Sequence, residues 1–557
     1  MNGAEHLCQI LNAHGVRHVF GLPGSQNSHL FSELRRAPTE TFVTTHEMSA
    51  GFAALGYAAT SNKPAVMAII SGPGLTYAQT PLQEARLDSI PIVCLVFVRQ
   101  HDPEKAFHTQ QIDHLGIAKS VCKDVLEVFS LEELASTFDQ AVTRANEGEP
   151  GPVVVFVESD LLGKKITQPA SLIPQQSIPV LDENIVDEIR SRVQDKSVLL
   201  IAGRGCLACA SDFRELAERL GAPVLTSTSA RGVLSENHDH AVRSDLVPAD
   251  LINQFIAQFD CILTMGIKFS ENSTQGFRLK LPKDKLVHID QGPHVSGRNF
   301  ESQLSLVAHV PTLIKALLNT NLEARKYDIG QLADWRSQFE ASLPTKHEPN
   351  IQGQSPPTAK RFFEVLATAL PDETILVTDS GNHQMLARKH YVCRAPNGLL
   401  LPTNFQSMGF AVSTAMGAKL AQPDRPVVAL IGDGGFQMSG LELAAAVRSK
   451  LNIVVIVFND GHFGLIRNKQ LAYDGFESDV SLPFLDIAGF ADSISANYVH
   501  GSTDIVRAVD DAVHREGPTI IEIALDDSVG FRRQQVKSRA KGTLKRALGE
   551  RIINLLK

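Results

Sequence analysis

Several features that would place a chain in a specialised class are missing from this sequence. No apolar run reaches the length needed to cross a membrane, and the first residues lack the basic start and apolar core of a signal peptide. The seven cysteines are scattered at irregular spacing, which argues against a disulfide framework and against a zinc site. We therefore expect a cytoplasmic protein with no membrane partner.

Excess positive charge is also missing. The chain has 53 Lys and Arg residues against 61 Asp and Glu residues, and its formal net charge is −8. An acidic balance argues against a nucleic-acid partner. The basic segment 528–557 is interpreted as a solvated surface tail.

What the sequence does contain is a long alternation of apolar runs and amphipathic stretches. Its 557 residues are too many for one hydrophobic core. Apolar runs that end in glycine-rich turns predict buried parallel strands, as at 66–70 and 427–431. We predict an α/β fold of three doubly wound domains with parallel sheets. The predicted domains are 1–165, 185–342 and 356–527, separated by Pro-rich linkers at 165–184 and 343–358.

Polar residues follow two neighbouring strands of the predicted third domain. Gly432-Asp433-Gly434-Gly435 follows the strand 427–431, an amphipathic helix around 441–447 comes next, and the strand 453–458 ends in Asn459-Asp460-Gly461. Ligands of doubly wound sheets bind at the carboxyl ends of the strands. A carboxylate and an amide oxygen suit Mg²⁺, and glycines let backbone N–H groups approach a phosphate. The pattern therefore indicates a metal-bridged diphosphate.

The middle domain begins with a strand that runs into Gly203-Arg204-Gly205. This turn lacks the third glycine of a dinucleotide fingerprint. We interpret the domain as a degenerate, Rossmann-like fold, and the sequence leaves FAD binding open.

Several motifs occur together in one order. Twenty-five residues separate Asp433 from Asn459. The other motifs are GLPGS at 21–25, HE at 46–47, SGPG at 71–74, GNHQM at 381–385 and MGF at 408–410. Along essentially its whole length the chain resembles the superfamily of thiamine diphosphate (ThDP)-dependent 2-oxo-acid decarboxylases and acetohydroxyacid (acetolactate) synthases. That family usually has Asn-Asn where this chain has Phe458-Asn459.

The resemblance implies a pyrimidine-binding, a middle and a diphosphate-binding domain. It also implies a homodimer or a dimer of dimers, with ThDP between the first domain of one subunit and the third domain of its partner. Glu47 is then the catalytic acid that bonds N1′ of the aminopyrimidine. Met408 supports the cofactor from below, and the backbone of Gln406 meets the aminopyrimidine.

The same resemblance assigns the diphosphate end of the cofactor. Asp433, Asn459 and the backbone oxygen of Gly461 are expected to hold Mg²⁺. The residues expected around the cofactor's diphosphate are Gly381, Asn382, His383, Gly434, Gly435 and Phe436, with Asn459 and Gly461 acting through the metal.

The reaction implied is decarboxylation of a 2-oxo acid to an enamine, followed by addition to a second carbonyl. Gln110 matches a synthase and carboligase segment and favours this carboligation. Ser25 and Leu465 instead resemble benzoylformate decarboxylase, which favours simple release of an aldehyde. The tryptophan that the synthases carry after Leu465 is missing, and Lys268 and Tyr77 replace their arginine and asparagine. A catalytically silent regulatory paralogue is the alternative of another class.

Overall fold

The computed structural model describes residues 1–100, 104–166, 181–343, 350–351, 358–501 and 504–526. Its contacts divide the chain into two compact units. Unit one comprises the described residues of Met1–Leu343, Cys393–Ser407 and Ser413–Arg425, and unit two those of Pro344–Val392, Met408–Val412 and Pro426–Lys557. The predicted tail and most of both predicted linkers lie outside the described residues.

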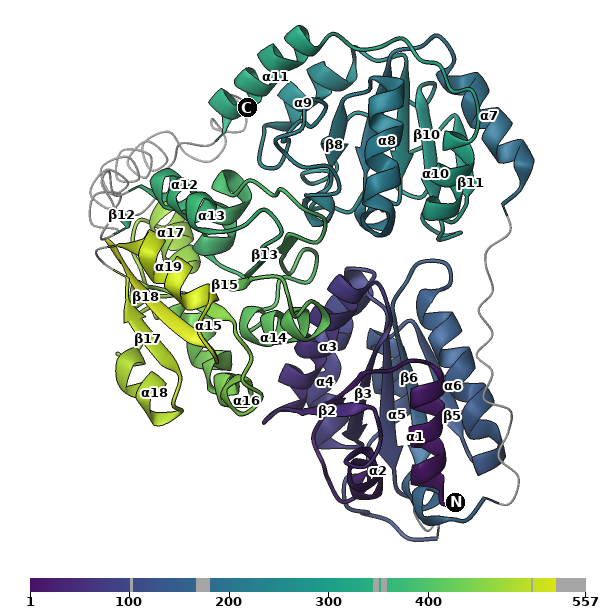
Figure 1. Cartoon of the computed structure of the whole chain (residues 1–557), viewed down its shortest axis with the longest axis vertical. Coiled ribbons are helices and arrows are strands. Elements are labelled where there is room, and N and C mark those ends of the chain that lie inside the picture. The colour runs from purple at the N-terminus through teal and green to yellow at the C-terminus, as the bar shows by residue number, and fades with distance from the viewer. Residues whose placement is uncertain (101–103, 167–180, 344–349, 352–357, 502–503, 527–557) are drawn as a thin grey trace, which may run out of the picture. The chain divides into compact units, whose positions relative to one another are not determined.

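The first sheet of unit one has six parallel strands in the order β2-β1-β3-β4-β6-β5. Alternate strand residues pack under α1, α2 and α6, and α3 and α4 pack against the strands as well (Figure 1). The strands are β1 (His18–Gly21), β2 (Glu40–Val43), β3 (Ala65–Ile70), β4 (Ile92–Val98), β5 (Asp124–Val128) and β6 (Pro152–Glu158). The helices are α1 (Gly3–Ala13), α2 (Ser28–Leu34), α3 (Glu47–Ser61), α4 (Pro73–Leu87), α5 (His114–Val121) and α6 (Leu131–Asn146).

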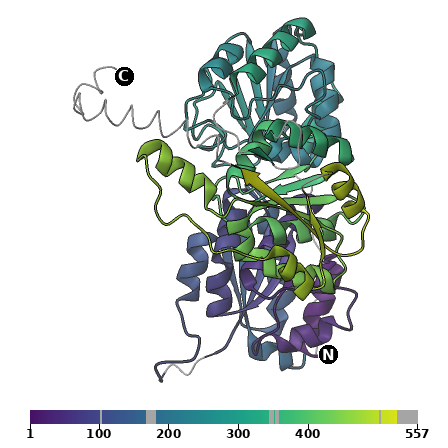
Figure 2. The ribbon, with the colours of Figure 1, turned by 90° about the vertical axis from the view of Figure 1, so that its left-hand side faces the viewer.

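The second sheet of unit one has five parallel strands in the order β11-β10-β9-β7-β8. Two apolar clusters form its core, one with α7, α8 and α10 and the other with α9 and α11. Figure 2 shows this sheet and its helices, coloured teal, in a second view. The strands are β7 (Val198–Ala202), β8 (Val224–Thr226), β9 (Cys261–Met265), β10 (Leu286–Asp290) and β11 (Leu304–Val307). The helices are α7 (Glu183–Val193), α8 (Ala210–Leu220), α9 (Ala249–Ile256), α10 (Val310–Leu318) and α11 (Ile329–Ser342).

The sheet of unit two contains β12-β18-β16-β15-β13 in this order, with β17 paired to β18. Its core strands are parallel, which confirms the predicted parallel sheet, and the short edge strand β12 is added antiparallel to β18. The strands are β12 (Asn350–Ile351), β13 (Ile375–Thr378), β15 (Val427–Gly432), β16 (Val454–Asn459), β17 (Asn497–His500) and β18 (Thr519–Asp526). The helices are α12 (Ala359–Ala369), α13 (Asn382–His390), α15 (Asp433–Ser439), α16 (Leu443–Arg448), α17 (Gly464–Tyr473), α18 (Ile487–Ser493) and α19 (Ile505–Val513).

The helix after β15 differs from the sequence prediction. Helix α15 begins directly at Asp433, and a 3₁₀ turn, Gly440–Glu442, separates it from α16. Leu441, which the pattern placed on the buried face of one helix, is 63% exposed. The break at residue 440 rotates the following turn, so the apolar spacing across it does not describe a single face.

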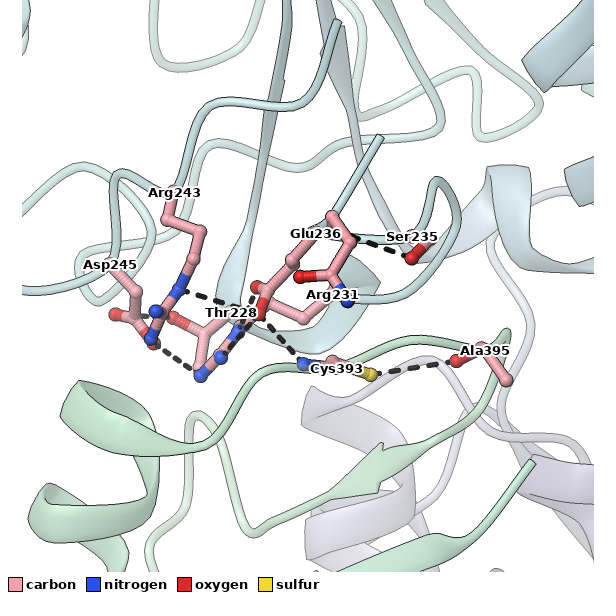
Figure 3. Close-up of polar contacts among 9 residues, drawn as sticks. Thr228, Arg231, Ser235, Glu236, Arg243, Asp245, Cys393 and Ala395 are labelled. Atoms are coloured by element: carbon pink, nitrogen blue, oxygen red, sulfur yellow. Dashed lines mark hydrogen bonds and ion pairs between the residues drawn. The ribbon is translucent and has the colours of Figure 1, made fainter. Parts of the chain in front are cut away.

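A buried ion cluster joins the segment Cys393–Ser407, which contains β14 (Leu399–Leu400), to the middle domain within unit one (Figure 3). Arg231 donates from Nε and Nη2 to the two oxygens of Glu236, at 2.6 and 2.9 Å. Glu236 also accepts from the backbone N–H of Cys393 at 2.8 Å. The Arg231 side chain is 2% exposed and also lies 3.8 Å from Asp245. These carboxylates raise the pKa of Arg231 above its usual value against the effect of burial.

Among the described residues, no helix is both long enough and apolar enough to cross a membrane. The same residues contain no group of three or more His, Cys, Asp and Glu side chains arranged to hold a metal ion.

Candidate functional site

The predicted metal ligands lie at the ends of two neighbouring parallel strands in unit two. Gly432 pairs with Phe458 in the register of β15 and β16, so Asp433 and Asn459 follow side by side. Asp433 is 4% exposed, and its Oδ2 accepts from the backbone N–H of Gly461 at 2.7 Å. Burial raises the pKa of Asp433, and the N–H groups of Gly434 and Gly461 oppose that rise. The three residues chosen from the sequence are therefore brought together.

The amide of Asn459 has a defined orientation. Its Nδ2 donates to Glu522 Oε1 at 2.8 Å, and the other oxygen of Glu522 accepts from the hydroxyl of Tyr498 at 2.7 Å. Because a carboxylate only accepts, the nitrogen of Asn459 must face Glu522 and its oxygen must face away. The carbonyl of Gly461 accepts from the N–H of Leu482 at 2.8 Å and keeps a second lone pair. Glu522 and Tyr498 were not identified from the sequence, because no motif connects β17 and β18 to this site.

His383 lies beside the metal candidates on α13, which follows β13. Its ring stacks on Phe458 and lies against the backbone of Gly381 and Gly432, where an added Cβ would stand 2.6 and 3.4 Å from ring atoms. Only glycine leaves that space at Gly381, whose φ of +154° is also unusual for other residues. Burial lowers the pKa of His383 to about 4, partly offset by its hydrogen bond to the backbone of Asp379. Its buried Nε2 has no hydrogen-bond partner among the described residues.

The other residues predicted to line the diphosphate form the first turns of α13 and α15. An added Cβ at Gly434 would meet the ring of Phe463 at 2.8 Å. Asn382 points its Nδ2 toward Gly464, at 2.9 Å from an added Cβ, and Gly464 directly precedes the half-buried Leu465. Gly435 faces Ile431 and Asp379 instead, and the ring of Phe436 packs on Phe490. Phe436 therefore offers a ligand its backbone only.

A carboxylate missed by the sequence interpretation holds the turn that carries Met408. Asp379 is fully buried at the end of β13, and it accepts from the N–H groups of Gly409 and Ala411 at 3.0 and 2.9 Å. Burial raises its pKa to about 6 in spite of these bonds. Met408 itself is half-buried at the start of this turn. In the sequence Asp379 stands two residues before the GNHQM motif, and nothing there indicates that it binds backbone groups 30 and 32 positions away.

Glu47 is the first residue of α3 in unit one. His46 caps this helix by accepting from the N–H of Met48 through Nδ1 at 3.1 Å, and its ring packs on Tyr77. The Glu47 carboxylate points toward the start of α4, where an added Cβ at Gly74 would lie 3.3 Å from its Oε1. The carboxylate of the HE motif therefore lies against the SGPG motif.

Gln110 and Ser25 approach the same end of the first sheet. Gln26, directly after Ser25, donates from Nε2 to Gln110 Oε1 at 2.9 Å. Gln26 also accepts from Ser71, at the start of the SGPG motif. Ser25 is exposed in the turn after β1. Sequence reasoning selected Ser25 and Gln110 but missed Gln26, which connects the two loops.

Gln406 lies in the part of the third domain that belongs to unit one. It has a φ of +63°, and its Nε2 donates to the carbonyl of Thr403 at 2.7 Å. Glu84 of α4 accepts from both the N–H and the hydroxyl of Ser407. Asp88, at the end of the same helix, accepts from the N–H of Thr403. Two buried acids therefore hold the loop that presents Gln406.

The glycine turn of the middle domain is packed against its own backbone. The N–H groups of Gly203 and Gly205 donate to the carbonyls of Met265 and Gly266 at 2.9 and 3.1 Å. An added Cβ at Gly203 would lie 1.9 Å from the Gly266 oxygen. These two N–H groups are therefore engaged within the protein, and the structure does not test FAD binding, which the sequence leaves open.

Three family models match the chain. The N-terminal TPP binding domain of thiamine pyrophosphate enzymes matches residues 1–117, the central domain matches 189–317, and the C-terminal TPP binding domain matches 379–523. Thiamine pyrophosphate is another name for ThDP.

Full-length relatives share the same order of domains. The acetolactate synthase isozyme 1 large subunit of Escherichia coli is 27% identical over 547 residues, which cover 94% of either chain. The chloroplastic acetolactate synthase 1 of Zea mays is 28% identical over 94% of this chain and 85% of its own. A probable acetolactate synthase large subunit of Methanococcus aeolicus is 26% identical over 95% and 92%. With three matching models in order and similarity along its whole length, this chain belongs to the thiamine pyrophosphate enzyme family.

Proposed function

We propose that the protein is a ThDP- and Mg²⁺-dependent carboligase that acts on a 2-oxo acid in the manner of the acetolactate synthases. The observation that carries this proposal is the pairing of Asp433 and Asn459 at the ends of β15 and β16. They lie in a chain that matches both TPP-binding domains of the family.

The oxygen atoms available at this site are suitable ligands for magnesium. A carboxylate, an amide oxygen turned away from Glu522 and a backbone carbonyl are hard ligands, and Mg²⁺ usually adds substrate phosphates and water to such a set. We assign Asp433, Asn459 and the carbonyl of Gly461 to the metal.

The surroundings of His383 fit a diphosphate. A buried ring nitrogen without a partner is costly unless a ligand supplies one. Gly381 gives the His383 ring its room, because an added Cβ there would lie 2.6 Å from a ring carbon. Asn382, Gly434, Gly435 and the backbone of Phe436 complete this proposed surface.

Glu47 is the proposed catalytic acid, and it would act at a cofactor held by the third domain of the other subunit. When bound, ThDP supplies the electron sink for loss of CO₂ from a 2-oxo acid. The Glu47 carboxyl would hold the proton at N1′ of the aminopyrimidine. Met408, on the turn held by Asp379, would support the ring from below, and the backbone of Gln406 would bond its edge.

Carboligation is favoured over simple decarboxylation by the way Gln110 is held. Its bond to Gln26 keeps it at the end of the first sheet, where it can contact a second carbonyl substrate. In the alternative decarboxylase reaction, the exposed Ser25 and the half-buried Leu465 would contact the substrate instead of Gln110. The proposed reaction requires no flavin, and the sequence leaves FAD binding open; a yellow colour of the purified protein would support bound FAD.

Incubation with ThDP, Mg²⁺ and pyruvate or larger 2-oxo acids tests the proposal. We expect CO₂ and a hydroxy-ketone, whereas an aldehyde as the only organic product would assign the decarboxylase alternative. Glu47→Gln should lose most of the turnover and still bind ThDP. The control is Glu40→Gln, a carboxylate that is 77% exposed on β2, and it should retain turnover. Equal activity of Glu47→Gln and the wild type would remove the catalytic assignment.

A further inference from the structure

Three polar side chains form a directed chain of hydrogen bonds at the ends of β1 and β3. Gln26 is 4% exposed, and its Oε1 accepts from both the backbone N–H and the hydroxyl of Ser71, each at 3.1 Å. On its other side, Nε2 of Gln26 donates to Oε1 of Gln110 at 2.9 Å. No sequence motif includes Gln26.

The backbone of Ser71 sets the direction of this chain. Its N–H can only donate, and it does so to Gln26 at 3.1 Å while also bonding the carbonyl of Phe97 at 2.9 Å. The oxygen of the Gln26 amide must therefore face Ser71, and its NH₂ must face Gln110. Because an NH₂ group requires an acceptor, Gln110 must present its oxygen to Gln26.

The remaining group of Gln110, its NH₂, therefore points away from the protein network. Among the described residues, none accepts from this nitrogen, and the side chain is only half-buried. We propose that Gln26 is a positioning residue that commits Gln110 to donate a hydrogen bond to an oxygen of the substrate, either the carboxylate or the carbonyl of a 2-oxo acid. This inference rests on the proposed function.

The backbone around Gln110 is held as firmly as its side chain. Gln110 has a φ of +64°, a left-handed backbone conformation that is strained for a non-glycine residue. Its Cβ and carbonyl lie over Gly72, 2.9 and 3.1 Å from where a Cβ would stand. Such conformations persist where the surroundings enforce them, and they are concentrated at ligand sites.

The topology of the sheet supports the same location. The strand order β2-β1-β3-β4 places the connections of β1 and β3 on opposite sides, which makes their junction the switch point of the sheet. Ligands of open α/β sheets bind in the crevice at that point. Gln26 follows β1, and Ser71 follows β3 directly.

The variant Gln26→Glu reverses the direction of the hydrogen bond between positions 26 and 110. The introduced carboxylate still accepts from Ser71, but it also demands a donor from Gln110, whose amide must then turn its oxygen toward the substrate. We expect kcat/KM for the 2-oxo acid to fall about 10- to 100-fold at pH 8. As the pH falls toward about 5, the introduced carboxyl becomes protonated, donates to Gln110 and restores part of the activity.

Two further variants separate the effect of hydrogen-bond direction from the effects of side-chain volume and added charge. Gln26→Met keeps the volume and releases the Gln110 amide, so it should lose less activity than Gln26→Glu and show no recovery in acid. Gln111→Glu places the same charge one residue from Gln110 on an exposed side chain, and it should behave as the wild type. Equal kcat/KM for wild type, Gln26→Glu and Gln26→Met, or a loss in Gln26→Glu that does not depend on pH, would overturn the inference.

A binding experiment distinguishes this inference from the proposed function. Should the wild type bind ThDP but turn over no 2-oxo acid, the proposed reaction is wrong. Calorimetric titration of the ThDP-loaded proteins with oxamate, a carboxylate with a neighbouring carbonyl, then tests Gln26 alone. Weaker binding to Gln26→Glu than to wild type and Gln111→Glu supports the inference. Equal binding, or no binding to the wild type, contradicts it.

Discussion

At the scale of single residues, both units share one feature, a buried acid that binds backbone N–H groups of a distant loop. Glu84, Asp88, Asp379 and Asp433 all do this. Burial raises the pKa of each of them, because it removes solvation from the charged form.

Glu84 should make stability depend on pH. Burial, followed by the charge of Asp88, raises its pKa from 4.5 to about 7. Between these values the folded protein keeps a proton that the unfolded chain has lost, so the free energy of unfolding falls as pH rises through this window. The fall attributable to Glu84 is at most about 3 kcal/mol.

Glu84→Gln should remove this pH dependence of the free energy of unfolding. The variant should be more stable than the wild type at pH 8 but not at pH 4.5. Urea unfolding across that range measures it. Glu132→Gln, which changes an exposed carboxylate on α6, is the control and should follow the wild-type profile. A Glu84→Gln profile parallel to that of the wild type would contradict the assignment.

His383 should take up a proton when ThDP binds. Its pKa of about 4 leaves the ring neutral at pH 6, and a diphosphate beside the unpartnered Nε2 would stabilise the protonated form. Calorimetry at pH 6 in buffers with different ionisation enthalpies counts the protons exchanged. The wild type and the exposed-site control His514→Gln should take up more protons than His383→Gln. The same proton count in all three proteins would place the diphosphate elsewhere.

The role of a residue could be predicted from the sequence only where the neighbouring residues indicate it. Asp433 and Asn459 end apolar strands, so their meeting followed from the rule that parallel strands align their carboxyl ends. Gln26 and Glu84 carry no such signal, because their partners lie 84 and 323 positions away.

At the scale of elements, apolar runs predicted strands well and helix boundaries poorly. The predicted strand 427–431 is β15, and 453–458 is β16 within one residue at either end. The helix after Asp433 was misjudged because the glycines that suggested a loop are accommodated in its first turn, where Phe463 and Asp379 leave no space for side chains. Short strands such as β12 and β14 carry too few residues to show a pattern.

The ion cluster around Arg231 is predicted to be essential for attaching the segment Cys393–Ser407. Glu236→Gln leaves Arg231 buried with an incomplete partner and should destabilise unit one by about 3–5 kcal/mol. The control, Glu215→Gln, removes an i,i+4 surface pair with Arg219 and should cost less than about 1 kcal/mol. Denaturant unfolding compares the two variants, and similar small losses in both would show that the cluster contributes little.

At the scale of the whole molecule, the proposed catalytic acid and the proposed metal ligands lie in different units of the chain. The predicted arrangement, with Glu47 of the partner subunit acting at a cofactor held by the third domain, has a direct consequence. A mixture of two inactive variants, Glu47→Gln and Asp433→Ala, should form mixed dimers in which one of the two sites is intact.

Co-refolding or co-expression of the two variants should recover about one quarter of the wild-type activity if subunits pair at random. Each variant expressed alone serves as the control and should stay inactive. No recovery in dimers shown to be mixed would mean that both residues act within one subunit.

The most direct test of the central claim is calorimetric titration of the metal-stripped protein with ThDP, with and without Mg²⁺. We predict saturable binding that requires Mg²⁺ in the wild type and is lost in Asp433→Ala, because the metal joins this carboxylate to the diphosphate. Binding of equal strength without the metal, or in Asp433→Ala, would contradict the account.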